Sequence, residues 1–212
     1  KELRRFFELI VFEFISLGGS WRRLKAQKIA PEYIENIVHS VERFAQQKIG
    51  MLIIIQGREN IDYHLQGGFD LDGKISEPLL QSIFDPSTPG HDGAVIIVGD
   101  KIVKFASHLP LSENFQQIKQ YGTRHSAGLG IAEKTDALSI IVSEERGSIA
   151  VARDSRLKVI SESGQLENEI VSFLNQKFTH KTESFLEKNM EDKIAACLIA
   201  LLLWYLVVYQ LR

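Results

Sequence analysis

Apolar residues at intervals of three and four positions predict three helices in the first half of the chain. Residues 3–17 gather their apolar side chains on one face, which is typical of an amphipathic helix. We expect this N-terminal helix, within residues 1–21, to pack against the core or a second subunit; binding to a membrane surface is the alternative. A second helix is expected to begin at Pro31, and a third to span residues 76–84 with Ser76 as its cap.

Short runs rich in β-branched residues predict the strands of a sheet. They lie at 51–57, 94–98, 101–111, 137–143 and 147–153. The segment SEERG at 143–147 is expected to join the last two strands as a hairpin, and Pro110 to direct the chain out of the sheet. Strands that alternate with helices predict a single globular α/β domain, with a central mixed β-sheet flanked by helices, over residues 22–160, plus terminal helices.

The composition changes after residue 160. Residues 161–193 are polar and favour a helical linker, whereas residues 194–209 contain no charged side chain. We interpret residues 194–212 as a transmembrane helix, with a buried or oligomerising helix as the alternative.

The overall charge limits the classes of partner. The chain has 212 residues with 25 Lys and Arg against 27 Asp and Glu, so no basic excess points to nucleic acid. Its single cysteine, Cys197, excludes an internal disulfide and a cysteine-based zinc site, and favours a reducing compartment for the folded part.

Two short motifs carry candidate chemistry. The segment GTRHSAGLG at 122–130 combines hydrogen-bond donors with three glycines, a composition that suits a phosphate group. The segment HDGA at 91–94 places a carboxylate at the entrance of a buried strand. Either motif alone is compatible with an ordinary surface turn.

The two motifs together with the text around them, from GGFDLDGKISEPLLQSIFDPSTPGHDGAVII through HLPLSEN to GTRHSAGLGIAEKTDALSIIVSEERGSIAVA, resemble the diadenylate cyclase (DAC) domain family. The resemblance covers about residues 35–160. It implies condensation of two ATP molecules into cyclic di-AMP with release of two pyrophosphates, at a site formed between two facing domains and assisted by Mg²⁺ or Mn²⁺. It further implies a homodimer or higher homo-oligomer. Because ATP is cytosolic, we expect the catalytic domain to face the cytoplasm, and the C-terminal helix predicted from residues 194–212 to hold it at the cell membrane.

The resemblance also assigns roles to residues of this sequence. Asp92, Arg124 and His125 are the expected catalytic residues, and Asp92 and His91 the expected metal ligands. The expected substrate-binding residues are Gly93, Ala94, Leu109, Pro110, Gly122, Thr123, Ser126 and Glu144. Gly67, Gly68 and Gly73 are expected to shape the approach to the nucleotide.

One position departs from the family pattern, in which the loop usually reads Arg-His-Arg. Ser126 stands at the third position and lacks the charge of arginine. Either a cation such as Arg146 or Lys119 substitutes for it, or the enzyme is slower, or the domain is a catalytically impaired nucleotide-binding sensor. A scaffold that only assembles is a third hypothesis.

Overall fold

The computed structural model describes residues 30–162 and 164–179. The expected N-terminal helix, residues 180–193 of the expected linker and the expected transmembrane helix at 194–212 lie outside the described residues. Within the described ranges, no helix is both long enough and apolar enough to cross a membrane. In chain order the elements are α2 (Pro31–Gln47), β1 (Met51–Ile55), η1 (Asp62–His64), β2 (Phe69–Lys74), α3 (Glu77–Ile83), η2 (Pro89–His91), β3 (Ala94–Val98), β4 (Lys101–Ser107), α4 (Phe115–Ile118), α5 (Thr123–Lys134), β5 (Leu138–Val142), β6 (Ile149–Arg153), β7 (Arg156–Ile160) and α6 (Gln165–Thr179).

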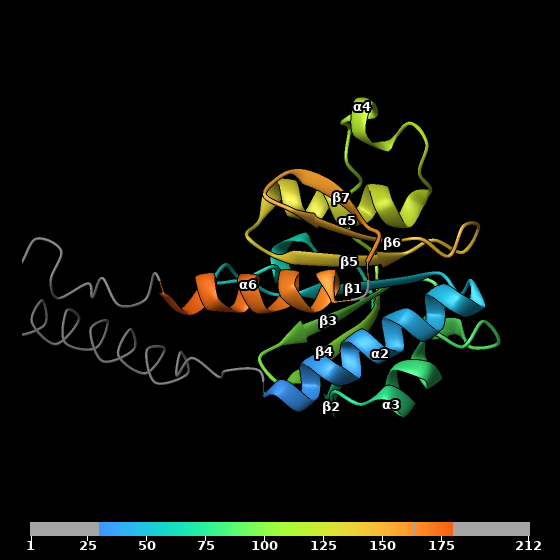
Figure 1. Ribbon diagram of the computed structural model, residues 1–212, viewed down its shortest axis with the longest axis vertical. Helices are drawn as coiled ribbons and strands as arrows, with labels where there is room; N and C mark the ends of the chain where they lie inside the picture. Colours follow the sequence, from blue (N-terminus) through green and yellow to red (C-terminus); the bar gives the residue numbers. More distant parts are fainter. Residues whose placement is uncertain (1–29, 163, 180–212) are drawn as a thin grey trace, which may run out of the picture. The chain divides into compact units, whose positions relative to one another are not determined.

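The predicted α/β fold with a mixed sheet is confirmed. Seven strands form one sheet in the order β2-β4-β3-β1-β5-β6-β7 (Figure 1). Only β1 and β3 pair in parallel, and all other neighbours are antiparallel, including the expected β5–β6 hairpin. The two edge strands, β2 and β7, were not predicted.

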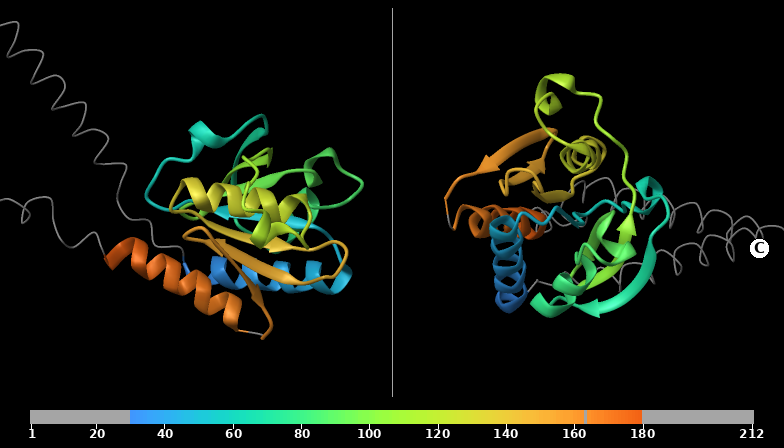
Figure 2. Two further views of the ribbon diagram at one scale, coloured as in Figure 1. Left: turned by 90° about the horizontal axis from the view of Figure 1, so that it is seen from above. Right: turned by 90° about the vertical axis from the view of Figure 1, so that its right-hand side faces the viewer.

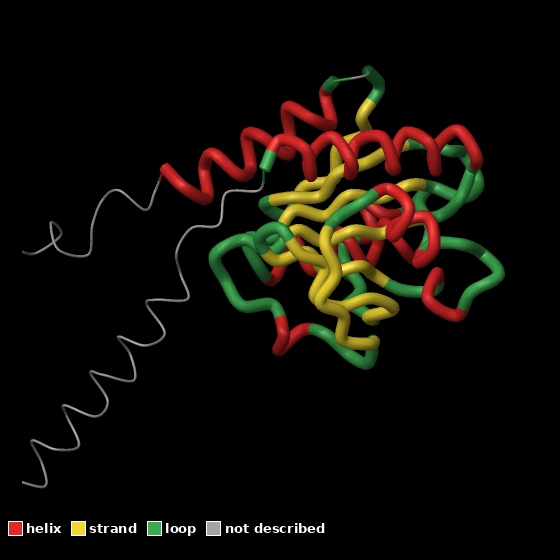
Figure 3. The backbone as a smooth tube through the Cα atoms, turned by 90° about the horizontal axis from the view of Figure 1, so that it is seen from below, coloured by secondary structure: helices red, strands yellow, loops and turns green. Residues whose placement is uncertain are grey.

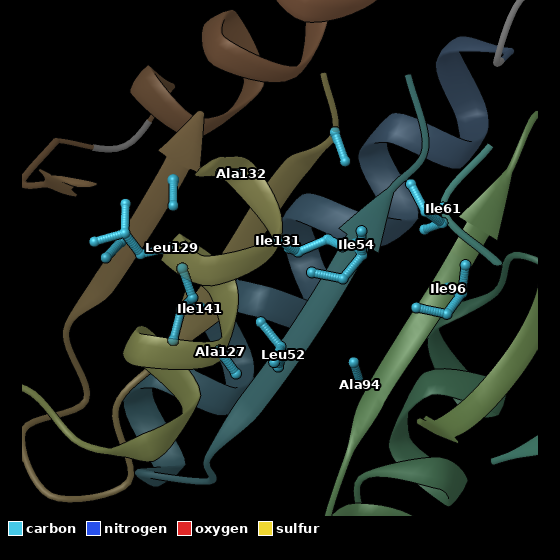
Figure 4. Packing of buried hydrophobic residues seen from close by; sticks show 13 residues of the cluster. Leu52, Ile54, Ile61, Ala94, Ile96, Ala127, Leu129, Ile131, Ala132 and Ile141 are labelled. Atoms are coloured by element: carbon cyan, nitrogen blue, oxygen red, sulfur yellow. The ribbon is translucent and has the colours of Figure 1, made fainter. Parts of the chain in front are cut away.

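The central strands are buried on both faces. One face of the sheet packs on α5, through Leu52 and Ile54 of β1, Ile96 of β3 and Ile141 of β5 (Figure 4). Alternate residues of β1 point to opposite faces, so Met51, Ile53 and Ile55 face the other side, where α2 and α6 lie (Figures 2 and 3). Helices on both faces explain why the strand sequences are continuously apolar.

Helix α2 confirms the helix predicted from Pro31, and α3 the one predicted at 76–84. Ser76 occupies the N-cap position of α3, but its side chain makes no capping hydrogen bond. Phe44 of α2 meets Phe84 edge to face at 5.7 Å between ring centroids, which ties the two helices together.

The buried part of the domain extends beyond residue 160. Helix α6 contributes four apolar side chains to the core: Leu166, Ile170, Phe173 and Leu174. Its Glu169 pairs with Lys158 of β7 at 2.6 Å. The first turns of the segment expected to be a linker are therefore a packed helix.

Candidate functional site

A cavity of about 470 Å³ opens at one end of the sheet. Four segments line it: residues 91–94 before β3, residues 107–109 at the end of β4, residues 120–125 around the start of α5, and residues 142–146 after β5. The register places these segments together, because Ala94 pairs with Ser107 and Met51 pairs with Val142. The two predicted motifs thus meet at one site, although they lie far apart in the sequence.

The GTRHSAGLG segment is the start of helix α5 rather than a loop. Gly122 is its N-cap, and none of Gly122, Gly128 and Gly130 has a positive φ. A Cβ on Gly130 would collide with the Pro110 carbonyl oxygen, and one on Gly128 would lie 3.0 Å from the Ile141 side chain. The interpretation that the three glycines suit a phosphate group does not hold for Gly128 and Gly130, because both are buried where α5 packs closely on its neighbours.

The Arg124 side chain is held by hydrogen bonds to two other segments of the cavity wall. Its Nη1 donates to Glu144 Oε2 at 2.6 Å, and its Nη2 donates to the His91 carbonyl oxygen at 3.4 Å. Gly50 leaves room for this pair, since a Cβ there would lie 2.5 Å from Arg124 Nη1 and 2.8 Å from Glu144 Oε2. The guanidinium is therefore pre-oriented at the cavity wall, with part of its charge already balanced.

His125 is buried at the cavity wall and is only 3% exposed. Burial, and then the positive charge of Arg146, lower the pKa of His125 to about 4. Its ring stacks on Tyr121 at 4.7 Å, and its Nε2 has no hydrogen-bond partner among the described residues. Near neutral pH the imidazole is therefore uncharged and offers hydrogen bonds to a ligand.

Asp92 is exposed in the cavity and has no hydrogen-bond or ion-pair partner among the described residues. The neighbouring His91 is half-buried, and its Nδ1 lies against the Thr88 carbonyl oxygen. Gly93 permits the close approach of β4, because a Cβ would lie 2.6 Å from the Ala106 backbone. Over residues 30–162 and 164–179, no cluster of three potential metal-ligating side chains occurs.

The comparisons with known proteins agree with this geometry. The family model described as DAC, DisA bacterial checkpoint controller nucleotide-binding, matches residues 38–157. The chain belongs to the DAC family. A diadenylate cyclase of Listeria monocytogenes is 46% identical over 158 residues, which are 74% of this chain and 56% of that protein. The chain thus spans only about half the length of this curated relative.

Solved structures also resemble this DAC domain. A double mutant of DacA from Staphylococcus aureus superposes with a TM-score of 0.62 and 37% identity, over 70% of this chain and 96% of that one. A hypothetical membrane spanning protein from Bacillus cereus superposes with a TM-score of 0.59 and 38% identity, over 60% of this chain and 63% of that one.

Most of the expected site residues line the DAC cavity. These are His91, Asp92, Gly93, Ala94, Leu109, Gly122, Thr123, Arg124, His125 and Glu144. Pro110 and Ser126 do not line it, nor do Gly67, Gly68 and Gly73. Leu111 takes the place expected for Pro110, and the Ser126 hydroxyl donates to the Ser112 carbonyl oxygen at 3.3 Å.

Sequence reasoning missed other residues of the cavity wall. Ser107 and Tyr121 line it, and so does Ser143. Ser107 is 1% exposed, and within residues 30–162 and 164–179 its hydroxyl has no hydrogen-bond partner. Its position directly after the left-handed Ala106, in a β-bulge opposite Ala94, comes from the pairing of β3 and β4 and has no counterpart in a sequence motif.

Proposed function

We propose that this DAC domain is a diadenylate cyclase that condenses two ATP molecules into cyclic di-AMP and releases two pyrophosphates. The observation that carries the proposal is a cavity lined both by a carboxylate with no partner among the described residues, Asp92, and by two guanidinium groups, Arg124 and Arg146. A carboxylate serves to activate a hydroxyl, and guanidinium groups bind phosphate oxygens. Each cavity takes one ATP, so two domains must face each other in a homodimer or higher homo-oligomer.

The reaction follows from these roles. The 3′-hydroxyl oxygen of one ATP attacks the α-phosphorus of the other, and the bond to the pyrophosphate oxygen breaks as the new ester bond forms. Asp92 lies where it can accept the hydroxyl proton, and Arg124 stabilises the negative charge on the α-phosphate. The neutral His125, with the proton on Nε2, donates a hydrogen bond to the same phosphate.

The charge of the cavity points to a cation that accompanies ATP. Three carboxylates, Asp92, Glu144 and Glu145, and two guanidinium groups line it, so its formal charge is −1 with the histidines counted as neutral. Mg²⁺ in proteins often binds through one carboxylate and the phosphates of its substrate, and the unpartnered Asp92 fits that pattern, with His91 beside it. Mg²⁺ or Mn²⁺ would neutralise phosphate charge and make the hydroxyl more acidic.

Ser126 does not weaken this proposal. Its hydroxyl donates to the Ser112 carbonyl oxygen, and Ser126 does not line the cavity. Serine in place of arginine at this position therefore does not lower the positive charge of the described cavity wall. Of the two candidate replacements, Arg146 lines the cavity and its guanidinium has no partner among the described residues, whereas Lys119 does not line it. We assign the second phosphate-binding charge to Arg146.

We also propose that residues 194–212 anchor the protein in the cell membrane, with the DAC domain facing the cytoplasm where ATP is found. The absence of charge from residues 194–209 supports this proposal. A membrane tether would raise the local concentration of domains and favour their pairing.

The test uses the full chain, purified in a mild detergent and incubated with ATP and either Mg²⁺ or Mn²⁺. Mass spectrometry should detect cyclic di-AMP from the wild type and none from Asp92→Asn. Asp62→Asn, an exposed carboxylate outside the cavity, is the matched control and should keep its activity. Full activity in Asp92→Asn would remove Asp92 from the mechanism, and ATP binding without product would favour a nucleotide sensor.

A further inference from the structure

The segment between β4 and α5 forms one wall of the cavity. Its last residues, Gln120, Tyr121 and Gly122, line the cavity and lead directly into Thr123 and Arg124. The short helix α4 in the middle of this segment projects from the rest of the domain (Figure 1). Its exposed Phe115 makes no buried contact that would hold it in place, because the side chain is 76% exposed.

Ile118, the last residue of α4, packs against the hydrophobic core, and hydrogen bonds from the Gln117 side chain join α4 to another part of the fold. The Gln117 Nε2 donates to the Ser155 carbonyl oxygen at 3.0 Å. The Gln117 Oε1 accepts from the Leu157 backbone N–H, also at 3.0 Å. One amide thus satisfies two backbone groups that lie 38 and 40 residues further along the chain.

The turn that receives Gln117 is itself fixed to α5. Asp154 and Ser155 form the two-residue turn that connects β6 and β7, and both have positive φ, as is typical of tight hairpin turns. The Ser155 N–H donates to the Ala132 carbonyl oxygen near the end of α5 at 3.2 Å. The turn therefore joins α4 to the same helix whose first turn carries Arg124 and His125.

We infer that Gln117 is a positioning residue for the nucleotide site, because it fixes the wall at 120–122 relative to α5. Ser112 anchors the start of the same segment: its N–H donates to the Ser126 carbonyl oxygen at 2.9 Å, and its hydroxyl donates to Glu133 at 2.8 Å. Between this anchor and Gly122, Gln117 supplies the side-chain bonds to another part of the fold. Releasing it frees the wall without removing any group from the cavity.

The test replaces Gln117 with methionine, which keeps the side-chain length and removes both hydrogen bonds. Gln116→Met is the matched control, because Gln116 is the exposed neighbour on the same helix. The first measurement is steady-state kinetics, which rests on the proposed function. We expect Gln117→Met to raise the KM for ATP about fivefold and to change kcat less than twofold. This is the effect expected from the loss of one to two neutral hydrogen bonds.

Hydrogen exchange provides a second arm that does not depend on turnover. The backbone N–H of Leu157 and that of Tyr121, which donates to the Ile118 carbonyl oxygen at 2.9 Å, should exchange faster in Gln117→Met but not in Gln116→Met. Unchanged exchange at Tyr121, or a wild-type KM despite faster exchange, would overturn the inference. If even the wild type made no cyclic di-AMP, the proposed function would fail, and the exchange of Tyr121 would still decide whether Gln117 fixes the wall.

Discussion

The buried imidazole of His125 should make the stability of the domain depend on pH. Its pKa is about 4 in the folded protein, against an ordinary value of 6.5. Because the folded pKa is lowered, the unfolded chain binds the proton more tightly, so stability is present above pH 6.5 and is lost as the pH falls toward 4. Linkage over this range gives a loss of about 2 kcal/mol between pH 7 and pH 5.

The measurement is denaturant unfolding of the wild type and His125→Gln at both pH values. Glutamine keeps polarity and approximate size but cannot take up the proton, so the variant should lose about 2 kcal/mol less than the wild type on acidification. His39→Gln, which removes an exposed imidazole from α2, is the control and should behave as the wild type does. Equal losses for the wild type and His125→Gln would refute the assignment of a neutral, desolvated His125.

Two further predictions concern the cavity. Ser107→Ala should leave the free energy of unfolding unchanged or raise it slightly, because it removes a buried hydroxyl that has no partner among the described residues. Ser139→Ala should lower it by about 1 kcal/mol, because that hydroxyl donates a buried hydrogen bond of 2.7 Å. Thermal unfolding compares the two variants, and equal losses of stability would mean that the Ser107 hydroxyl has a partner. Arg146→Ala should raise the KM for ATP about tenfold or more through loss of a charged hydrogen bond, and Lys119→Ala should not; steady-state kinetics that show the reverse order would transfer the phosphate-binding role to the lysine.

The sequence predicted the central strands and missed the edges of the sheet for one physical reason. A strand buried on both faces is continuously apolar, as in MLIII of β1, and this pattern is easily recognised. The edge strands read FDLDGK in β2 and RLKVI in β7, and most of their residues are exposed. Charged side chains suit an unpaired edge, but they leave no apolar run by which a strand could be predicted.

The site was predictable as a set of motifs but not as a geometry. The Asp-Gly-Ala and Arg-His motifs do meet at one cavity, yet the glycines around the second were interpreted as part of a phosphate-binding loop. Glycine is selected both for its backbone freedom and for its lack of a side chain, and a sequence does not distinguish the two. In α5 the second reason applies, because Gly128 and Gly130 are helical and tightly packed.

Burial also changes the chemical meaning of the Arg-His motif. In the sequence it presents two cations, but in the fold the His125 imidazole is neutral and the Arg124 guanidinium is paired with Glu144. The motif alone therefore supplies little net charge for a triphosphate. Under the proposed function, we expect the guanidinium of Arg146, from the turn after β5, and a divalent cation that arrives with the nucleotide to supply the rest. We therefore expect the domain to bind the metal complex of ATP more tightly than free ATP, because the metal complex brings positive charge to a cavity whose wall has a small net negative charge.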